Sequence, residues 1–112
     1  MYRIKQNSDY PPLTATLYQA DGTLLSLENA TEVLFYMRKK NGPSVIQSGV
    51  CEIITVGDIK KIRYQWQSGD TAMPGLYVAE FMVKYGDMIQ KVPNSSYSEI
   101  EIIRTLEDPV ES

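Results

Sequence analysis

The chain has 112 residues, of which 43% are hydrophobic, and its formal net charge is −3. This length fits one domain with a core that needs neither disulfides nor metals, and the composition excludes disorder of the whole chain. The acidic balance excludes a nucleic-acid partner, which would need a basic face. No apolar run is long enough to span a membrane, and the N-terminal residues MYRIKQNSDY lack the apolar core of a signal peptide.

Apolar and polar residues alternate along much of the chain, which is typical of half-buried β-strands. Clusters of Gly, Pro, Asn and Asp separate these runs and predict turns. In chain order, the pattern predicts strands over residues 4–6, 13–18, 24–27, 33–38, 45–47, 50–56, 62–67, 77–84, 89–92 and 97–104. It predicts turns at Asp21-Gly22, Asn41-Gly42, Gly57-Asp58 and Gly86-Asp87, and a loop over residues 93–96.

The strand over residues 33–38 has apolar side chains on both faces, with Val33, Phe35 and Met37 on one and Leu34 and Tyr36 on the other. We therefore expect it to be central and covered on both sides.

The clearest alternation lies in residues 62–83. Ile62, Tyr64 and Trp66 share one strand face, and a second face carries Tyr77 and Phe81. We predict that Trp66 and Phe81 are core aromatics.

No segment shows a helical period, and strands recur about every 8–12 residues, so the chain is predicted to be all-β. Alternation alone leaves a sandwich and a barrel open. Asp70, as the cap of a turn, followed by Gly75 and by Tyr77 at the start of a strand, favours an immunoglobulin-like antiparallel β-sandwich, in which such a Tyr bonds the nearby backbone. Ala79 stands where antibody-type domains have Cys, so the sandwich would lack their disulfide.

The sequence offers little for catalysis. It has no His and a single Cys51, which excludes Ser-His-Asp and Cys-His catalysis and any His-containing metal site. Cys51 lies in the apolar run VCEIITV, where we expect a buried, inert thiol. The carboxylates Asp58, Asp70, Glu80 and Asp87 are the alternative as an acid/base pair, but their turn and polar-face positions favour structural roles. We therefore expect no catalytic residue, no metal and no cofactor.

Short motifs follow one another between residues 2 and 104. They are Ile4-Lys5-Gln6-Asn7, Pro12-Leu13, Ala15-Thr16-Leu17, Asp21-Gly22, Leu27-Glu28-Asn29-Ala30, Met37-Arg38, Tyr64-Gln65-Trp66, Gly69-Asp70-Thr71, Gly75-Leu76-Tyr77, Ala79-Glu80-Phe81 and Pro93-Asn94 with Tyr97. In this order they resemble the N-terminal, immunoglobulin-like domain of phage baseplate upper proteins, found in tailed phages and prophages. Each motif alone is a common strand or turn, so their order carries the resemblance. Val92 stands where the family has Phe.

The resemblance implies a structural domain without a catalytic motif, which docks an appendage onto the central baseplate of a phage tail. We therefore expect a virion protein that is made and folded in the host bacterial cytoplasm. Its partners would be other tail or baseplate proteins, and it would be a homo-oligomer in the assembly, with no nucleic acid and no membrane bound. The family's helical stalk and receptor-binding domain do not occur within these 112 residues, so a free-standing component and a shortened chain are both open.

We expect one immunoglobulin-like domain over residues 1–104 and a flexible acidic tail over residues 105–112. Tyr is frequent, with eight copies, and Tyr suits contact surfaces. The candidate interface residues are Tyr2, Tyr10, Tyr18 and Tyr36.

Two other functions stay open. One is a carbohydrate-binding β-sandwich for adhesion to a host surface, with Trp66 and the tyrosines as a sugar platform, although Trp66 alternates in phase with the core positions Ile62 and Tyr64. The other is a small β-barrel enzyme that uses carboxylates.

Overall fold

The computed structural model describes residues 2–93 and 98–106. Within these residues there are nine β-strands and no helix, so the all-β prediction is confirmed. The strands are β1 (Tyr2–Lys5), β2 (Leu13–Ala15), β3 (Glu32–Lys39), β4 (Ser44–Val50), β5 (Glu52–Val56), β6 (Ile59–Tyr64), β7 (Gly75–Tyr85), β8 (Met88–Val92) and β9 (Ser98–Ile103). In the described part of the chain, no helix is long and apolar enough to cross a membrane.

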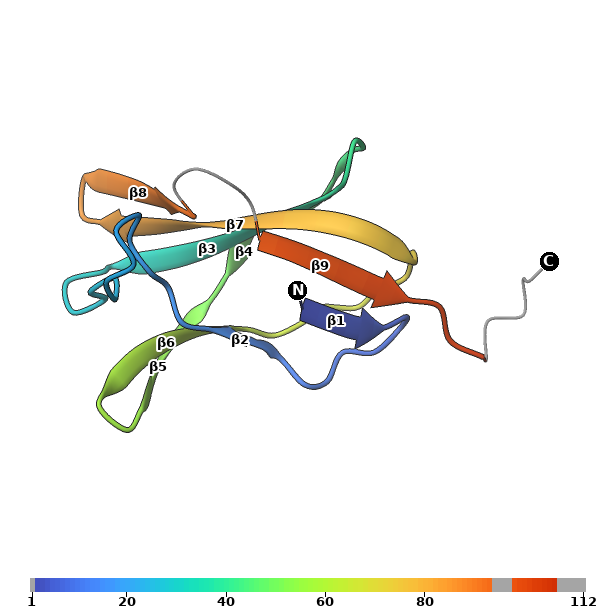
Figure 1. The fold of residues 1–112 in the computed structure, drawn as a ribbon, viewed down its shortest axis with the longest axis horizontal. Coiled ribbons are helices and arrows are strands. Elements are labelled where there is room, and N and C mark those ends of the chain that lie inside the picture. Colours follow the sequence, from blue (N-terminus) through green and yellow to red (C-terminus); the bar gives the residue numbers. More distant parts are fainter. Residues whose placement is uncertain (1, 94–97, 107–112) are drawn as a thin grey trace.

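The strands form two sheets that pack face to face (Figure 1). The larger sheet has six strands in the order β1-β9-β7-β3-β4, and β8 also pairs with β7. The smaller sheet has the order β2-β6-β5. The long strand β7 pairs with β9 along residues 75–79 and with β8 along residues 81–85. The described strands thus form two layers and not the closed sheet of a barrel.

The prediction of a purely antiparallel sandwich is wrong at one strand pair. β1 runs parallel to β9, with Tyr2 opposite Ile100 and Lys5 opposite Ile103. A 2.7 Å hydrogen bond from the backbone nitrogen of Gln6 to the Ile103 carbonyl continues this pairing past the end of β1. The larger sheet is therefore mixed.

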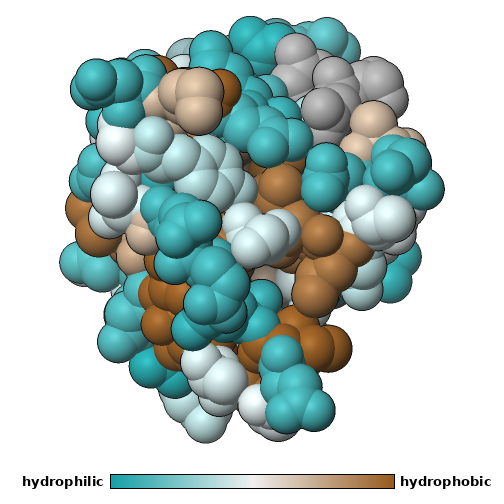
Figure 2. All heavy atoms as spheres, turned by 90° about the vertical axis from the view of Figure 1, so that its left-hand side faces the viewer, coloured by the Kyte–Doolittle hydropathy of each residue, from teal (hydrophilic) through white to brown (hydrophobic). Residues whose placement is uncertain are grey.

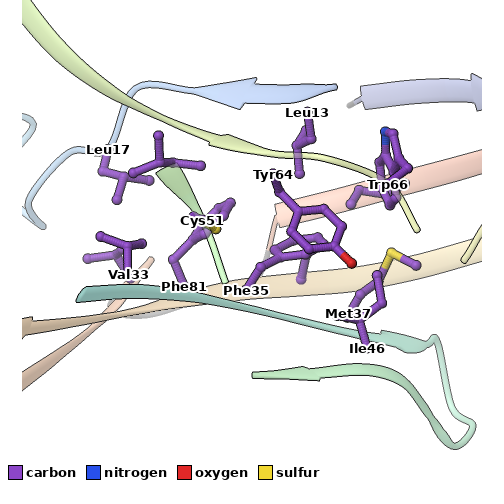
Figure 3. Packing of buried hydrophobic residues seen from close by; sticks show 14 of the residues in the cluster. Leu13, Leu17, Val33, Phe35, Met37, Ile46, Cys51, Tyr64, Trp66 and Phe81 are labelled. Carbon is purple, nitrogen blue, oxygen red and sulfur yellow. The ribbon is translucent and has the colours of Figure 1, made fainter. Parts of the chain in front are cut away.

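The core lies between the two sheets and centres on an aromatic cluster. Phe35 is fully buried, and its ring centroid lies 4.9 Å from that of Tyr64, 5.2 Å from Phe81 and 6.1 Å from Trp66. Figure 3 shows these side chains gathered between the layers. The alternation in β7 correctly predicts its buried face, which consists of Tyr77, Ala79, Phe81 and Val83.

β3 lies between β7 and β4 and is the central strand that the sequence predicts. Phe35 and Met37 face the core and are buried. Leu34, which faces the other way, is only 6% exposed, so β3 is covered on both faces where Leu34 lies.

Two predicted strands near the N-terminus are shorter or missing. β2 ends at Ala15, whereas the prediction ran to Tyr18. Residues 24–27 form no strand; Leu24 makes a single antiparallel bridge to Tyr18 across the Asp21-Gly22 turn. Leu17, Leu25 and Leu27 are nevertheless buried, because residues 16–31 cross one end of the sandwich between the layers (Figure 1).

A third boundary is misplaced. The predicted break at Ser48-Gly49 lies inside β4, and the real break is at Cys51. There the chain leaves the larger sheet and enters the smaller one as β5. The positive φ of 56° at Ser48 marks a bulge in β4 and not the end of a strand.

Some predictions concern residues outside the described part. The predicted loop over residues 93–96 lies outside the described residues except for Pro93. The predicted start of the last strand at Tyr97 and the tail from residue 107 onward also lie outside them. The described part of the last strand, β9, has Ile100 and Ile102 buried, as predicted.

Candidate functional site

A buried tyrosine ties the link between β6 and β7 to the core. The Tyr64 side chain is 4% exposed, and its hydroxyl donates a 2.7 Å hydrogen bond to Asp70 Oδ2. The same oxygen accepts a 2.8 Å hydrogen bond from the backbone nitrogen of Gln67, and the Asp70 nitrogen donates to the Gln67 carbonyl at 3.0 Å. Asp70 therefore closes the turn over residues 67–70 and fixes it to the core.

The environment of Tyr64 favours its neutral form. Burial raises the pKa of the Tyr64 phenol, and the hydrogen bond to Asp70 and the negative charge of Asp70 raise it further. The phenol thus remains a hydrogen-bond donor, which is a structural role.

A second tyrosine fixes the start of β7. Tyr77 is 2% exposed, and its hydroxyl donates a 2.6 Å hydrogen bond to the carbonyl of Met73. Burial raises the pKa of this phenol as well. Between them Gly75 has a φ of +144°, which side chains of L-residues rarely adopt, so glycine lets the chain enter the strand without strain.

Two buried polar side chains bring the N-terminal segment to the same corner. Gln6 is 7% exposed; its Nε2 donates a 2.9 Å hydrogen bond to the Ala72 carbonyl, and its Oε1 accepts a 3.3 Å bond from the Thr105 nitrogen. Thr71 is 4% exposed, and its hydroxyl donates a 2.9 Å bond to the Ser8 carbonyl. Both pairings satisfy polar groups that would be costly to bury alone.

Three of the sequence motifs, over residues 4–7, 69–71 and 75–77, thus meet at one end of the sandwich. The alternation analysis did not single out Gln6 and Thr71, although both lie inside those motifs. The groups here bond to one another and to the backbone, which makes the corner a structural joint.

The other carboxylates are dispersed. Asp58 and Asp87 lie in exposed turns, and Glu80 lies on the outward side of β7. In residues 2–93 and 98–106, no group of three His, Cys, Asp or Glu side chains could hold a metal ion.

Cys51 is buried, as predicted, at the crossing from β4 to β5. Burial raises the pKa of its thiol to about 12, so the thiolate is disfavoured. The thiol makes a weak 3.8 Å hydrogen bond to the Gly49 carbonyl. This environment is that of an unreactive core cysteine.

Trp66 lies just beyond β6 and is 2% exposed. Its ring centroid lies 5.6 Å from that of Tyr64 and 6.2 Å from that of Tyr2. Because the ring is enclosed, Trp66 does not supply the sugar platform of the carbohydrate-binding alternative.

The four candidate interface tyrosines differ in exposure. Tyr10 and Tyr18 are 79% and 55% exposed. Tyr2 is half-buried beside Trp66, and Tyr36 is half-buried with its hydroxyl 2.9 Å from Ser48 Oγ. Tyr10 and Tyr18 are therefore the two with most of their surface available for a partner.

Exposed apolar side chains gather at the end of the sandwich opposite the Tyr64–Asp70 corner. The β5–β6 turn, the β7–β8 turn and residues 16–31 are all at this end, with the β5–β6 turn in the smaller sheet and the β7–β8 turn in the larger one (Figure 1). Figure 2 shows this end of the molecule, where hydrophobic residues are exposed between hydrophilic ones. Six large hydrophobic residues of these segments are exposed, and we call them the apolar end: Tyr18, Leu24, Val56, Ile59, Met88 and Ile89. Of these, only Tyr18 is among the interface residues that the sequence predicts.

The outward face of the larger sheet carries a shallow depression of about 270 Å³. Residues of β3, β4 and β7 line it: Tyr36, Met37, Arg38, Ser44, Ile46, Val78, Ala79 and Glu80. Of these, Met37, Ile46 and Ala79 belong to the core. The sequence pattern does not predict a site here, because residues that are distant in the sequence line the depression.

No family model, curated protein or solved structure matches the chain.

Proposed function

We propose that the protein is a structural, non-enzymatic component of a phage or prophage tail or baseplate, built as an immunoglobulin-like sandwich that docks through protein–protein contacts. It is assembled in the virion with other tail proteins and with further copies of itself.

The strand arrangement supports the immunoglobulin-like part of the proposal. In an immunoglobulin sandwich of variable type, one sheet has strands G, F, C and C′ and the other has B, E and D. The order β9-β7-β3-β4 over β2-β6-β5 corresponds to that pattern. The hydrogen bond from Tyr77, near the start of β7, to Met73 corresponds to the tyrosine corner of such sandwiches. Trp66 departs from the pattern, because it follows β6 and not the strand that corresponds to C.

The observation that carries the docking part is the apolar end. Exposed apolar groups that cluster on a small protein mark surfaces for contact with other proteins. Within residues 2–93 and 98–106, half of the twelve exposed large hydrophobic residues belong to three segments at this one end. Met88 and Ile89 are the most prominent pair, at 70% and 56% exposure. Burying these side chains against a partner would remove apolar area from water, which favours association.

The ordered motifs support the assignment to a tail or baseplate. Their residues form the joint between the N-terminal segment, the β6–β7 link and the start of β7. The motifs that resemble the baseplate family are therefore residues that stabilise the fold. This agrees with a structural domain that is bound by other proteins.

The test is co-purification with the tail and baseplate proteins encoded beside this chain, with mass measured by light scattering. We expect a complex that is weakened by the double substitution Met88→Ser and Ile89→Ser. The matched control is Met73→Ser, which removes an exposed apolar side chain from the link between β6 and β7, outside the apolar end and apart from the candidate interface tyrosines. If the protein associates neither with itself nor with any of these proteins, the proposal is wrong.

A further inference from the structure

We propose that the depression on the outward face of the larger sheet binds a neutral saccharide unit of hexose size. This site is independent of the docking function and uses neither Trp66 nor the apolar end.

Two charged side chains of opposite sign line the depression. Two ion pairs on this sheet lie beyond the depression along the strands, one toward each end: Lys84 with Glu32 at 3.5 Å and Lys40 with Glu99 at 3.6 Å. Arg38 and Glu80 line the depression between them. Among the described residues, neither takes part in an ion pair or a side-chain hydrogen bond. One donor group and one acceptor group thus face the same small space without a partner.

The strand pairing beside the depression is irregular. The register between β3 and β4 shifts between Phe35 and Met37 and again between Met37 and Arg38. Bulges of this kind redirect side chains and often accompany binding sites. The contact between the Tyr36 hydroxyl and Ser48 Oγ holds the Tyr36 ring along one wall. A wall that is fixed before binding lowers the entropic cost of holding a ligand.

The lining can both donate and accept hydrogen bonds. The Arg38 guanidinium only donates hydrogen bonds, the Glu80 carboxylate only accepts them, and the Ser44 hydroxyl does both. Neighbouring hydroxyls of one sugar ring can accept from the first and donate to the second. The two opposite charges cancel, so the lining gives no preference to an anion such as phosphate. The Tyr36 ring and Val78 offer apolar surface to the C–H groups of the ring.

The volume limits the size of the ligand. About 270 Å³ lies just below the range of roughly 300–1,000 Å³ for pockets that enclose drug-sized molecules. The depression therefore suits a single sugar unit, and its shallow form implies weak binding.

The experiment is a titration of the ¹⁵N-labelled protein, followed by amide chemical shifts. The probes are the methyl glycosides of glucose, galactose, N-acetylglucosamine and rhamnose, each up to about 50 mM, which covers the millimolar dissociation constants expected of a small, shallow site. We expect saturable shifts with at least one glycoside, confined to residues 36–38, 44–46 and 78–80. Arg38→Ala and Glu80→Gln should each weaken binding about tenfold, because each removes a charged hydrogen-bonding group.

The control variant is Lys84→Ala, which breaks the neighbouring ion pair with Glu32 on the same sheet and should leave the affinity unchanged. The absence of saturable shifts with all four glycosides would overturn the proposal, as would shifts that map to another surface. Glycine serves as a zwitterionic probe: shifts in the depression with glycine but with no glycoside would assign the site to a charged ligand and also overturn the proposal.

Discussion

Tyr64 and Asp70 are joined by a 2.7 Å hydrogen bond that spans from the end of β6 to the turn before β7. The Tyr64 ring packs against Phe35 in the core, while the Asp70 carboxylate also holds the Gln67 backbone nitrogen. One contact thus couples the packing between the sheets to the conformation of the link, and the link leads directly to Tyr77.

We expect Tyr64→Phe to lower the free energy of unfolding by about 1.5–3 kcal/mol, the usual range for a hydrogen bond to a charged group. Asp70→Ala should cost at least as much, because it also frees the Gln67 nitrogen. The measurement is urea unfolding of both variants and of the double variant. Since both substitutions remove the same bond, the double variant should cost less than the sum of the two. Strict additivity would show that the bond contributes nothing to stability.

Tyr77→Phe is expected to cost about 1 kcal/mol, since it removes the 2.6 Å hydrogen bond to the Met73 carbonyl and keeps the buried ring. Urea unfolding gives this value directly. The matched control is Tyr10→Phe, which removes the same hydroxyl from a ring that is 79% exposed and should change stability little. Equal effects of the two substitutions would mean that the corner bond does not hold β7.

The sequence was most informative where one strand face is buried. Alternation in β7 correctly predicts four core residues, because a strand with one buried face has an apolar residue at every second position. These residues are Tyr77, Ala79, Phe81 and Val83. The parallel pairing of β1 with β9 is not visible in the sequence of β1, because it depends on which distant strand lies beside β1 in the sheet. Leu34 differs, because the apolar side chains on both faces of residues 33–38 predict that its outward face is covered, and the side chain is buried.

The candidate surfaces were harder to predict. Sequence alone does not separate Tyr2, which packs beside Trp66, from Tyr10, which is exposed, because the burial of each ring depends on which distant residues pack against it. The depression next to Arg38 and Glu80 lies where the register between β3 and β4 shifts, and the Ser48-Gly49 pair at one of these shifts has the composition of a strand break. A bulge and a turn use similar residues, so only the pairing partner distinguishes them.

Gly49→Ala should destabilise the protein by about 1–3 kcal/mol, the usual cost of overpacking a core. A Cβ at this position would lie 2.7 Å from Cε1 of the Tyr64 ring, closer than real contacts allow. Thermal or urea unfolding measures the loss. In a Tyr64→Leu background, where the ring is absent, the additional cost of Gly49→Ala should be smaller. An unchanged cost in that background would place the clash elsewhere.

Cys51 should make stability depend on pH in the alkaline range. The folded protein raises the pKa of this thiol from 9.0 to about 12, so the folded state binds the proton more tightly than the unfolded chain. The resulting stabilisation is fully present below pH 9 and is lost as the pH rises toward 12. Between pH 8 and pH 10 the loss should be about 1.4 kcal/mol. Urea unfolding at these two pH values should show it.

Cys51→Ala is the control for that prediction, because it removes the titrating group whatever its own effect on baseline stability. The fall between pH 8 and pH 10 should be smaller in this variant by the same amount. Tyr64 and Tyr77, whose pKa values are also raised, lose their contribution at higher pH, since the ordinary pKa of a phenol is 10.0. An identical pH slope in the wild type and in Cys51→Ala would contradict the raised thiol pKa.

Trp66→Ala should lower the free energy of unfolding by about 3–5 kcal/mol, because the indole is 2% exposed and packs against Tyr64 and Phe35. Trp66→Phe keeps an aromatic ring in the same space and should cost clearly less. Trp66 is the only tryptophan in the chain, so emission from the folded wild type reports on this site alone and should lie at the short wavelengths of an apolar environment. The methyl glycosides that shift the amides of residues 36–38 should leave this emission unchanged, since the ring lies in the core, away from the outward face of the sheet. A shift of the emission on adding a glycoside would show that the sugar reaches the core side of β3 and would contradict the position inferred for the site.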